Sequence, residues 1–271
     1  MKKLITIITL GALLAACSST PKNEPKGMKI TKVNVDQQLP DSTQWVSSDT
    51  VIYDAQGRLT KVDYIRFSYA DGKVIADCDS VHINRRFIRR CEVSTQAGKP
   101  ITMLINYYRS PQTGGMVSQG EVTVTDTLVT LDLKHSMPGY PEPFNEVLSC
   151  RMDAAGRLIS KRSDPVMEGV EAWSKVTYQY APDSKMGNQD LQVLAFYLQP
   201  ADLEDLVLMV AGYLPALKKD IVTKVHTSYK RGPEAMEEDG SSSFTFDADG
   251  RLIAAKAVYG GQQAQNLTVE Y

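Results

Sequence analysis

Hydrophobic and polar residues alternate along most of this chain, and such alternation predicts β-strands with one buried and one exposed face. The pattern is clearest in residues 122–124 and 129–133, on either side of a turn expected at Asp126 and Thr127. Because the connections between such runs are short, we expect neighbouring strands to pair antiparallel in a meander. The β-rich runs cover residues 29–35, 45–53, 58–69, 73–95, 101–109, 146–163, 172–180, 190–197, 220–230, 243–247, 251–259 and 266–271.

Three seven-residue segments of similar sequence predict β-hairpin turns: Tyr53–Leu59, Met152–Leu158 and Phe246–Leu252. In each one an Asp can accept hydrogen bonds from backbone N–H groups just ahead, and a Gly takes the left-handed position that a side chain would resist. The apolar residue before the Asp and the Arg-Leu pair after the Gly belong to the two strands. The turn residues are Asp54, Gly57, Asp153, Gly156, Asp247 and Gly250.

Residues 200–214 have helical rather than strand periodicity. Prolines at positions 200 and 215 suit the start and the end of a helix, and acidic side chains in its first turn favour the helix dipole. Because the apolar face is wide, we expect this helix to pack on the concave face of the sheet. A position on a membrane surface is the alternative, which the acidic polar face disfavours. The helical spacing is carried by Leu203, Leu206, Val207, Val210 and Leu214.

The first sixteen residues have the parts of a bacterial export signal. Two lysines precede an apolar run from Leu4 to Leu14. At about 1.5 Å per residue this run covers only about half of a bilayer core of roughly 30 Å, which predicts a signal peptide at residues 1–16 and not a transmembrane helix. The segment Leu14–Cys17 resembles the lipobox of bacterial lipoproteins, and the resemblance implies cleavage before Cys17 and acylation of this residue.

Residues 17–27 are polar and contain prolines, so we expect a flexible tether in front of a single β-meander domain at residues 28–271. Two or three acyl chains on Cys17 would hold the protein firmly at a membrane. In lipoproteins an Asp after the Cys often retains the protein in the inner membrane, whereas this chain has Ser18. The predicted location is therefore the cell envelope, lipid-anchored at the outer membrane and facing either the periplasm or the cell surface.

Composition and charge limit the class of partner. The chain is 42% hydrophobic, which is enough for a sizeable core. Removal of residues 1–16 takes away two lysines and leaves 28 basic and 32 acidic residues, a formal charge of about −4. Such a chain offers no basic field for nucleic acid, so we expect no nucleic-acid partner.

The cysteines left after Cys17 are three, an odd number in an oxidising compartment. If residues 84 and 85 form a two-residue hairpin turn, Cys78 faces Cys91 and the two can form a cross-strand disulfide. Three reduced, partly buried thiols are the alternative. The three histidines are scattered along the chain, so local spacing predicts no metal site, and we expect no cofactor.

The sequence has none of the common catalytic motifs. We find no Gly-x-Ser-x-Gly elbow, no phosphate-binding Gly loop and no His-Glu-x-x-His. Asp77 and Asp79 have the chemistry of glycosidase carboxylates, but both lie on one strand without a visible cleft. The nearby Arg85, Arg86, Arg89 and Arg90 have the chemistry of an anion site. In the hairpin register given above Asp79 faces Arg90, so ordinary cross-strand ion pairing explains part of this cluster. We therefore expect a protein that is not an enzyme.

The loop from Pro138 to Phe144 is the best candidate for a binding surface. Its three prolines stiffen it, and it carries the aromatic residues Tyr140 and Phe144. Rigid aromatic side chains are effective contact residues, which predicts a ligand or partner contact here. The alternative is that both rings fold under the loop and close one end of the sheet.

Two family resemblances follow from these features. The Tyr-Asp and Gly-Arg-Leu turns resemble the YD repeats of large secreted shell and toxin proteins, although the copies here lie too far apart for tandem repeats. The lipid signal, the hairpins, the helix ending in Tyr213-Leu214-Pro215 and the strands from Phe244 to Tyr271 resemble a family of lipoproteins of Bacteroides-like bacteria, a domain of unknown function with a porin-like fold. The resemblance implies a curved antiparallel sheet or barrel attached to a membrane by lipid. It carries no catalytic residues. Because Lys, Arg and Asp occur throughout the predicted strands, we expect a soluble barrel-like body outside the bilayer.

These observations lead to one main hypothesis of function and two alternatives. We expect a non-enzymatic envelope lipoprotein that binds an outer-membrane protein or a ligand such as a glycan. The first alternative is a carrier of an apolar ligand inside the barrel, with the helix as plug or lid. A hydrolase is the second alternative.

Overall fold

The structure is a computed structural model that describes residues 29–38, 44–79, 88–96, 99–108, 115–139, 142–166, 169–181, 193, 197, 202–214, 222–260 and 263–271. The predicted signal peptide, Cys17 and the tether lie outside the described residues, and so does Tyr140.

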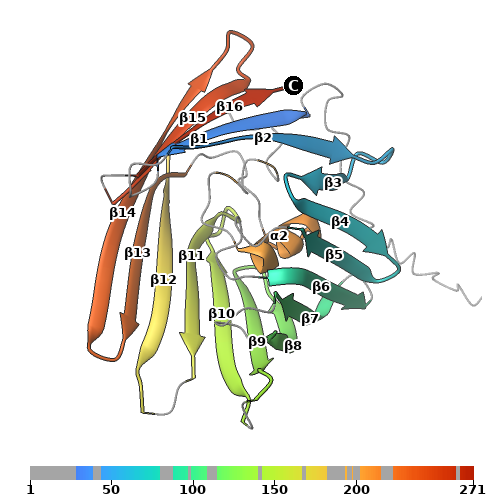
Figure 1. The fold of residues 1–271 in the computed structure, drawn as a ribbon, viewed down its shortest axis with the longest axis vertical. Coiled ribbons are helices and arrows are strands. Elements are labelled where there is room, and N and C mark those ends of the chain that lie inside the picture. Colours follow the sequence, from blue (N-terminus) through green and yellow to red (C-terminus); the bar gives the residue numbers. More distant parts are fainter. Residues whose placement is uncertain are drawn as a thin grey trace, which may run out of the picture.

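The described residues form sixteen antiparallel strands in one closed barrel, shown in Figure 1. Each strand pairs with its neighbours in the sequence, and the last strand pairs with the first. This confirms the all-β antiparallel meander and shows that its curved sheet closes on itself. The strands are β1 (Lys32–Gln38), β2 (Gln44–Tyr53), β3 (Leu59–Val62), β4 (Ile65–Ala70), β5 (Lys73–Cys78), β6 (Ile88–Gln96), β7 (Lys99–Tyr107), β8 (Val117–Val124), β9 (Leu128–Ser136), β10 (Phe144–Met152), β11 (Leu158–Pro165), β12 (Ala172–Tyr180), β13 (Val222–Arg231), β14 (Glu234–Phe246), β15 (Leu252–Tyr259) and β16 (Gln263–Glu270).

Antiparallel pairing gives the barrel two distinct ends. Even-numbered strands finish at one end, which we call the turn end, and the chain also enters β1 and leaves β16 there. Lys29, just before β1, donates a hydrogen bond from Nζ to the carbonyl of Gly57 in the turn between β2 and β3. Odd-numbered strands finish at the opposite end, which we call the loop end. Lys29 and Tyr271 therefore both lie at the turn end.

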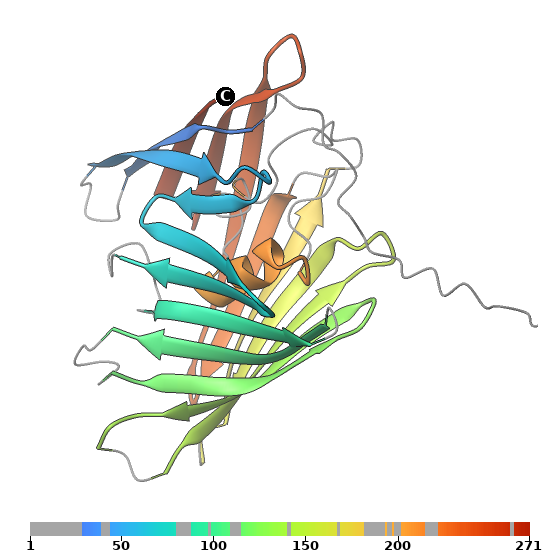
Figure 2. The same cartoon turned by 90° about the vertical axis from the view of Figure 1, so that its right-hand side faces the viewer.

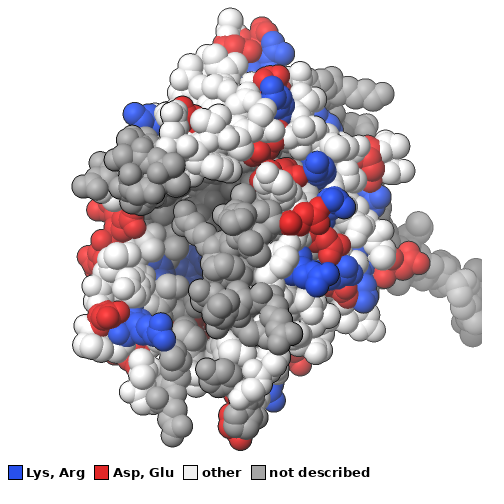
Figure 3. All heavy atoms as spheres, viewed as in Figure 1, with Lys and Arg blue, Asp and Glu red and all other residues white. Residues whose placement is uncertain are grey.

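Strand β9 shows how the sequence pattern becomes the barrel wall. Val129, Leu131 and Leu133 point inward and are at most 2% exposed, whereas Asp132 and Lys134 point outward into solvent. Figure 3 shows Lys and Arg intermixed with Asp and Glu over the visible face of the molecule. Ion pairs such as Lys32 with Glu270, Lys73 with Glu92 and Arg90 with Asp77 also lie on the outer wall, which is thus charged, whereas most of the inner wall is apolar.

The three Asp-x-x-Gly-Arg-Leu segments form tight turns at the turn end. Asp153 Oδ1 accepts hydrogen bonds from the backbone N–H groups of Ala155 and Arg157, both at 2.9 Å. Its Oδ2 accepts one from Arg157 Nε at 2.6 Å, and Gly156 has a φ of +73°. The hydrogen bonds from Arg157 lower the pKa of Asp153. The same pattern recurs with Asp54, Gly57 and Arg58 and with Asp247, Gly250 and Arg251.

A tyrosine from later in the chain covers each turn arginine. The guanidinium of Arg157 lies 5.4 Å from the ring centre of Tyr180, whose hydroxyl donates to the carbonyl of Leu158 at 2.7 Å. Tyr69 covers Arg58 in the same way, and Tyr271 covers Arg251. The three turns are therefore copies of one structural unit, whose tyrosine lies outside the seven-residue sequence match.

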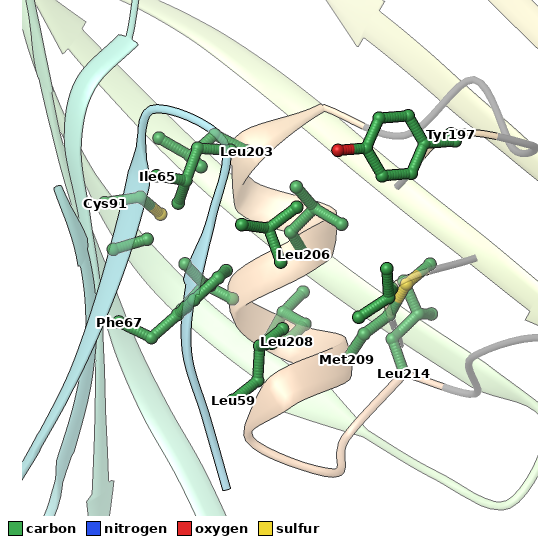
Figure 4. Close-up of a cluster of buried hydrophobic side chains, with 14 of the residues drawn as sticks. Leu59, Ile65, Phe67, Cys91, Tyr197, Leu203, Leu206, Leu208, Met209 and Leu214 are labelled. Atoms are coloured by element: carbon green, nitrogen blue, oxygen red, sulfur yellow. The ribbon is translucent and has the colours of Figure 1, made fainter. Parts of the chain in front are cut away.

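Helix α2 (Leu203–Val210) lies inside the barrel, as Figures 1 and 2 show, and this agrees with the helix predicted at residues 200–214. All its residues from Leu203 to Met209 are buried, because the barrel surrounds it. Figure 4 shows Leu203, Leu206 and Leu208 among strand side chains that include Ile65 and Phe67. No helix in the described part of the chain is long and apolar enough to span a bilayer.

Several predicted strand limits were wrong. In the run 190–197 the two described residues, Val193 and Tyr197, are helical. Both are buried. The run 58–69 is broken by a turn at Asp63 and Tyr64, in which Asp63 has a φ of +50°. The acidic run in front of residue 243 belongs to β14.

The register of β5 and β6 differs by two residues from the one expected for a turn at residues 84–85. Cys91 faces Ala76, and Cys78, Cys91 and Cys150 are buried thiols that form no disulfide with one another. The same shift gives Arg90 a different partner, because its guanidinium contacts Asp77 at 3.1 Å.

Candidate ligand cavity in the barrel

A cavity of about 300 Å³ lies inside the barrel, in its loop-end half. This volume is at the lower end of the range of small-molecule sites, which is about 300–1,000 Å³. Five of the seven lining residues are charged or carry a hydroxyl group. The lining residues, from β10, β11, β12 and the start of α2, are Glu146, Leu148, Lys161, Ser163, Ser174, Val176 and Asp202.

Lys161 is the only cation that lines this cavity among the described residues, and it holds the helix to the wall. Its Nζ lies 2.8 Å from Asp202 Oδ2 and 2.5 Å from Asp205 Oδ2. Asp205 Oδ2 also accepts a hydrogen bond from the backbone N–H of Asp202 at 2.9 Å, so the pair is built into the first turn of α2. Glu204 is buried beside them.

Burial shapes the ionisation of this cluster. Burial alone would lower the pKa of Lys161, but Asp202 and Asp205 hold it well above its ordinary value. Burial raises the pKa of Asp205, although Lys161 opposes this change. Lys161 is therefore charged at neutral pH, and the carboxylates around it outnumber it.

A second polar group continues from the cavity toward β8. Ser163 donates a hydrogen bond to Glu146 Oε1 at 2.5 Å, and Glu146 Oε2 lies 3.0 Å from Nε2 of His135. On the other side of the ring, Nδ1 of His135 lies 2.5 Å from the hydroxyl of Ser118. Ser118 pairs directly with His135, and His135 pairs with Phe144, which lies two residues before Glu146 on the inward side of β10. The group fixes the Glu146 carboxyl at the cavity wall.

Ser118, His135 and Glu146 have the composition of a hydrolytic triad, but the geometry does not suit one. Ser118 has no exposed surface and does not line the cavity, so its hydroxyl is not accessible to a substrate. The contact between Nε2 of His135 and Glu146 is close but is not an aligned hydrogen bond, which a triad needs to orient the ring. In the described residues no three metal-binding side chains converge on one point.

Phe144 is the one described aromatic residue of the predicted binding loop. It begins β10, two residues before Glu146 on the same inward row. One face of its ring stacks on His135, with ring centres 4.5 Å apart and planes inclined by 18°, and the residue is 37% exposed. Phe144 thus covers the buried polar group and also offers apolar surface beside the cavity. Tyr140 lies outside the described residues.

The cavity residues were not identified from the sequence. Glu146 is in phase with the inward Leu148 and Cys150, and this is the signal that could have found it, because a charged residue in an apolar row needs a buried partner. The contacts of Lys161 could not be predicted from nearby residues, because its partners Asp202 and Asp205 are more than 40 residues away in the sequence.

Similarity to known proteins extends to structures only. No protein-family model matches this chain, and no curated protein matches its sequence. A porin-like protein from Bacteroides vulgatus is similar in structure, with a TM-score of 0.64 and 11% sequence identity, covering 90% of this chain and 99% of that chain. A porin-like protein from Bacteroides uniformis gives a TM-score of 0.51 and 11% identity, covering 90% of this chain and 97% of the other. These similarities confirm the porin-like β fold, and the lipoprotein assignment stays a prediction.

Proposed function

We propose that this protein is a non-enzymatic envelope lipoprotein that binds a small polar ligand, such as a fragment of a glycan, in the cavity at the loop end. The observation that carries the proposal is the lining, in which Glu146, Lys161 and Asp202 present charges and two serines present hydroxyl groups. Such groups are suited to hydrogen bonds with a sugar, and the exposed part of Phe144 offers an apolar surface for its ring.

The alternative, a carrier of an apolar ligand, has less support. Helix α2 and the side chains around it fill the apolar part of the barrel, as Figure 4 illustrates. The cavity beside them has a charged lining, and an apolar ligand there would remove charged groups from water without replacing their hydrogen bonds.

The position of Lys29 supports a definite orientation on the membrane. A lipid on Cys17 would hold the turn end toward the bilayer, because the tether joins the barrel next to Lys29. The cavity would then face away from the membrane and toward its ligand. The charged outer wall supports a barrel that stands in water, since a membrane-spanning barrel needs an outward apolar band about 25 Å tall.

We expect Cys17→Ser to abolish membrane attachment. Without the thiol no diacylglyceryl group can be added, and the barrel has a charged outer wall. Fractionation of cells that express the full chain should place the wild-type protein with the membranes and the variant in the soluble fraction. Cys78→Ser is the matched control, because Cys78 is buried in the barrel. Membrane attachment of Cys17→Ser equal to that of the wild type would contradict the lipid anchor.

We expect Ser174→Phe to abolish ligand binding. The ring adds bulk inside a cavity of about 300 Å³. The measurement is thermal unfolding with a panel of neutral and amino sugars, because a ligand at about 100 times its Kd stabilises the folded state by about 2.7 kcal/mol. Thr123→Phe is the control, since Thr123 points outward from β8. The proposal fails if the sugars that shift the melting temperature shift that of Ser174→Phe equally, or if only fatty acids shift it.

A further inference from the structure

Strand β2 extends past the end of its neighbour β3. Gln44–Thr50 pair with β1 on one side, whereas only Val51, Ile52 and Tyr53 pair with β3 on the other. Figure 2 shows that β2 continues beyond the short β3 and its turn into β4. Within the described part of the chain no backbone group pairs with Gln44–Thr50 on the β3 side. Among the described residues these seven strand residues, about 23 Å at 3.3 Å per residue, therefore form a free edge in an otherwise closed ring.

The hydrogen-bonding groups of this edge can be assigned to individual residues. The backbone N–H of Val51 donates to Thr31 on the β1 side at 2.9 Å. The carbonyl of Ile52 accepts a hydrogen bond from the hydroxyl of Thr60, on the β3 side. Because successive residues of a strand face opposite neighbours, the even-numbered residues present their N–H and C=O groups to the free edge. These residues are Gln44, Val46, Ser48 and Thr50.

The outward side chains of the edge carry no charge. Natural proteins commonly protect a free edge with Lys, Pro or a bulge, and residues 44–50 contain neither residue type. Val46 is 66% exposed, and the Oγ atom of Ser47 is buried without a hydrogen-bond partner. Asp49, the one charged residue, points inward and accepts a hydrogen bond from Tyr197 at 2.7 Å. The edge therefore favours an uncharged partner strand.

We propose that the free edge of β2 binds an uncharged extended peptide segment of a partner protein by strand addition. Only an extended backbone can satisfy a row of donors and acceptors in this spacing. The added strand would continue the barrel wall above the turn at Asp63 and Tyr64. A second copy of this chain does not fit there. If its β2 paired with this edge, its β1 and β16, which lie beside its β2, would overlap with β4 and β5 of the first copy.

Hydrogen exchange of the full protein tests this proposal. The probe is a capped peptide of seven alternating Thr and Val residues, and its control carries N-methyl groups on the edge that would face β2. We expect the unmodified probe to slow exchange of the Val46, Ser48 and Thr50 amides, and the N-methylated peptide to leave it unchanged. Ser48→Pro should weaken binding about tenfold or more, because it removes one donor and blocks the edge. Ser48→Ala is the matched control and should bind like the wild type.

Ser48→Pro is suitable because the Ser48 N–H makes no hydrogen bond to β1, so the variant should fold, and its melting temperature verifies this. Equal binding to Ser48→Pro and Ser48→Ala would overturn the proposal. So would failure of the probe to slow the three amides at saturating peptide concentration. Protection of these amides without peptide also overturns the proposal, because the edge is then already covered. Protection that rises with protein concentration would mean that a second copy covers it, and protection independent of concentration would mean that the chain itself does.

Discussion

Lys161→Met is expected to lower the free energy of unfolding by about 3–5 kcal/mol at neutral pH. Lys161 is 7% exposed, and its ammonium group is the cation between Asp202 and Asp205. Met keeps the length and most of the volume of the side chain but removes the charge. The two carboxylates then stay close to each other, and close to Glu204, without that cation. Because these residues form the first turn of α2, the loss also releases the helix from β11.

Chemical denaturation measures this effect, and pH gives it a signature. At neutral pH the carboxylates of the variant repel each other, whereas burial raises the pKa of Asp205, so the loss should shrink as the pH is lowered. Lys134→Met on the outward face of β9 is the control, with an expected change within about 0.5 kcal/mol.

The triple change of Lys161→Met with Asp202→Asn and Asp205→Asn should regain more than half of the lost stability, because it removes the buried charges together. The amide oxygen introduced at position 205 would still accept the hydrogen bond from the backbone N–H of residue 202. A single variant as stable as the wild type would mean that Lys161 does not hold α2 in place.

The sequence predicted what depends on neighbouring residues. Alternation identified β8 and β9, and three Asp and Gly pairs identified the turns after β2, β10 and β14, because strands and tight turns are determined within a few residues. The turn at Asp63 was missed, since no Gly or Pro marks it and its left-handed residue is an Asp. The register of β5 and β6 was missed because it depends on a connection longer than the two residues assumed.

The cavity depends on contacts between distant parts of the chain. The segment between β12 and β13 leaves the sheet at the turn end and places α2 inside the barrel, where Asp202 meets Lys161. Periodicity predicted the helix and its burial on the concave face, but not the strand that it meets. The pairing of Glu146 with His135 likewise requires the register of β9 with β10. A charged residue in an apolar row therefore predicts a buried polar partner without identifying it.

Asp63→Asn is expected to stabilise the protein at pH 8 and to have little effect near pH 4. Asp63 lies in the turn between β3 and β4, and burial together with the charge of Asp49 raises its pKa to about 7, while Lys61 opposes this. Asp49 also accepts a hydrogen bond from Tyr197, so this cluster joins the wall to the segment inside the barrel. Asn can adopt the left-handed backbone of Asp63 and removes only its charge.

The direction of the change in stability with pH follows from the difference in the pKa of Asp63 between the folded and unfolded states. The folded protein holds a proton on Asp63 up to about pH 7, whereas an unfolded Asp loses its proton near pH 4. Stability associated with this proton is fully present below about pH 4 and is lost as the pH rises to about 7. At about 1.36 kcal/mol per pH unit the full loss would be about 4 kcal/mol, and solvent screening at this half-exposed turn reduces it to about 1–2 kcal/mol.

Denaturation of wild type and Asp63→Asn between pH 4 and pH 8 should thus give two curves that meet at low pH and separate above it. Asp71→Asn, in the exposed turn between β4 and β5, is the control for a general effect of charge and should follow the wild type. A constant difference between Asp63→Asn and wild type over this range would contradict the raised pKa of Asp63. A difference that grows up to pH 7 and then stays level would show that ionisation of Asp63 next to Asp49 destabilises the protein. The destabilised contact is the one that joins β2, the β3–β4 turn and Tyr197, next to the free edge of β2.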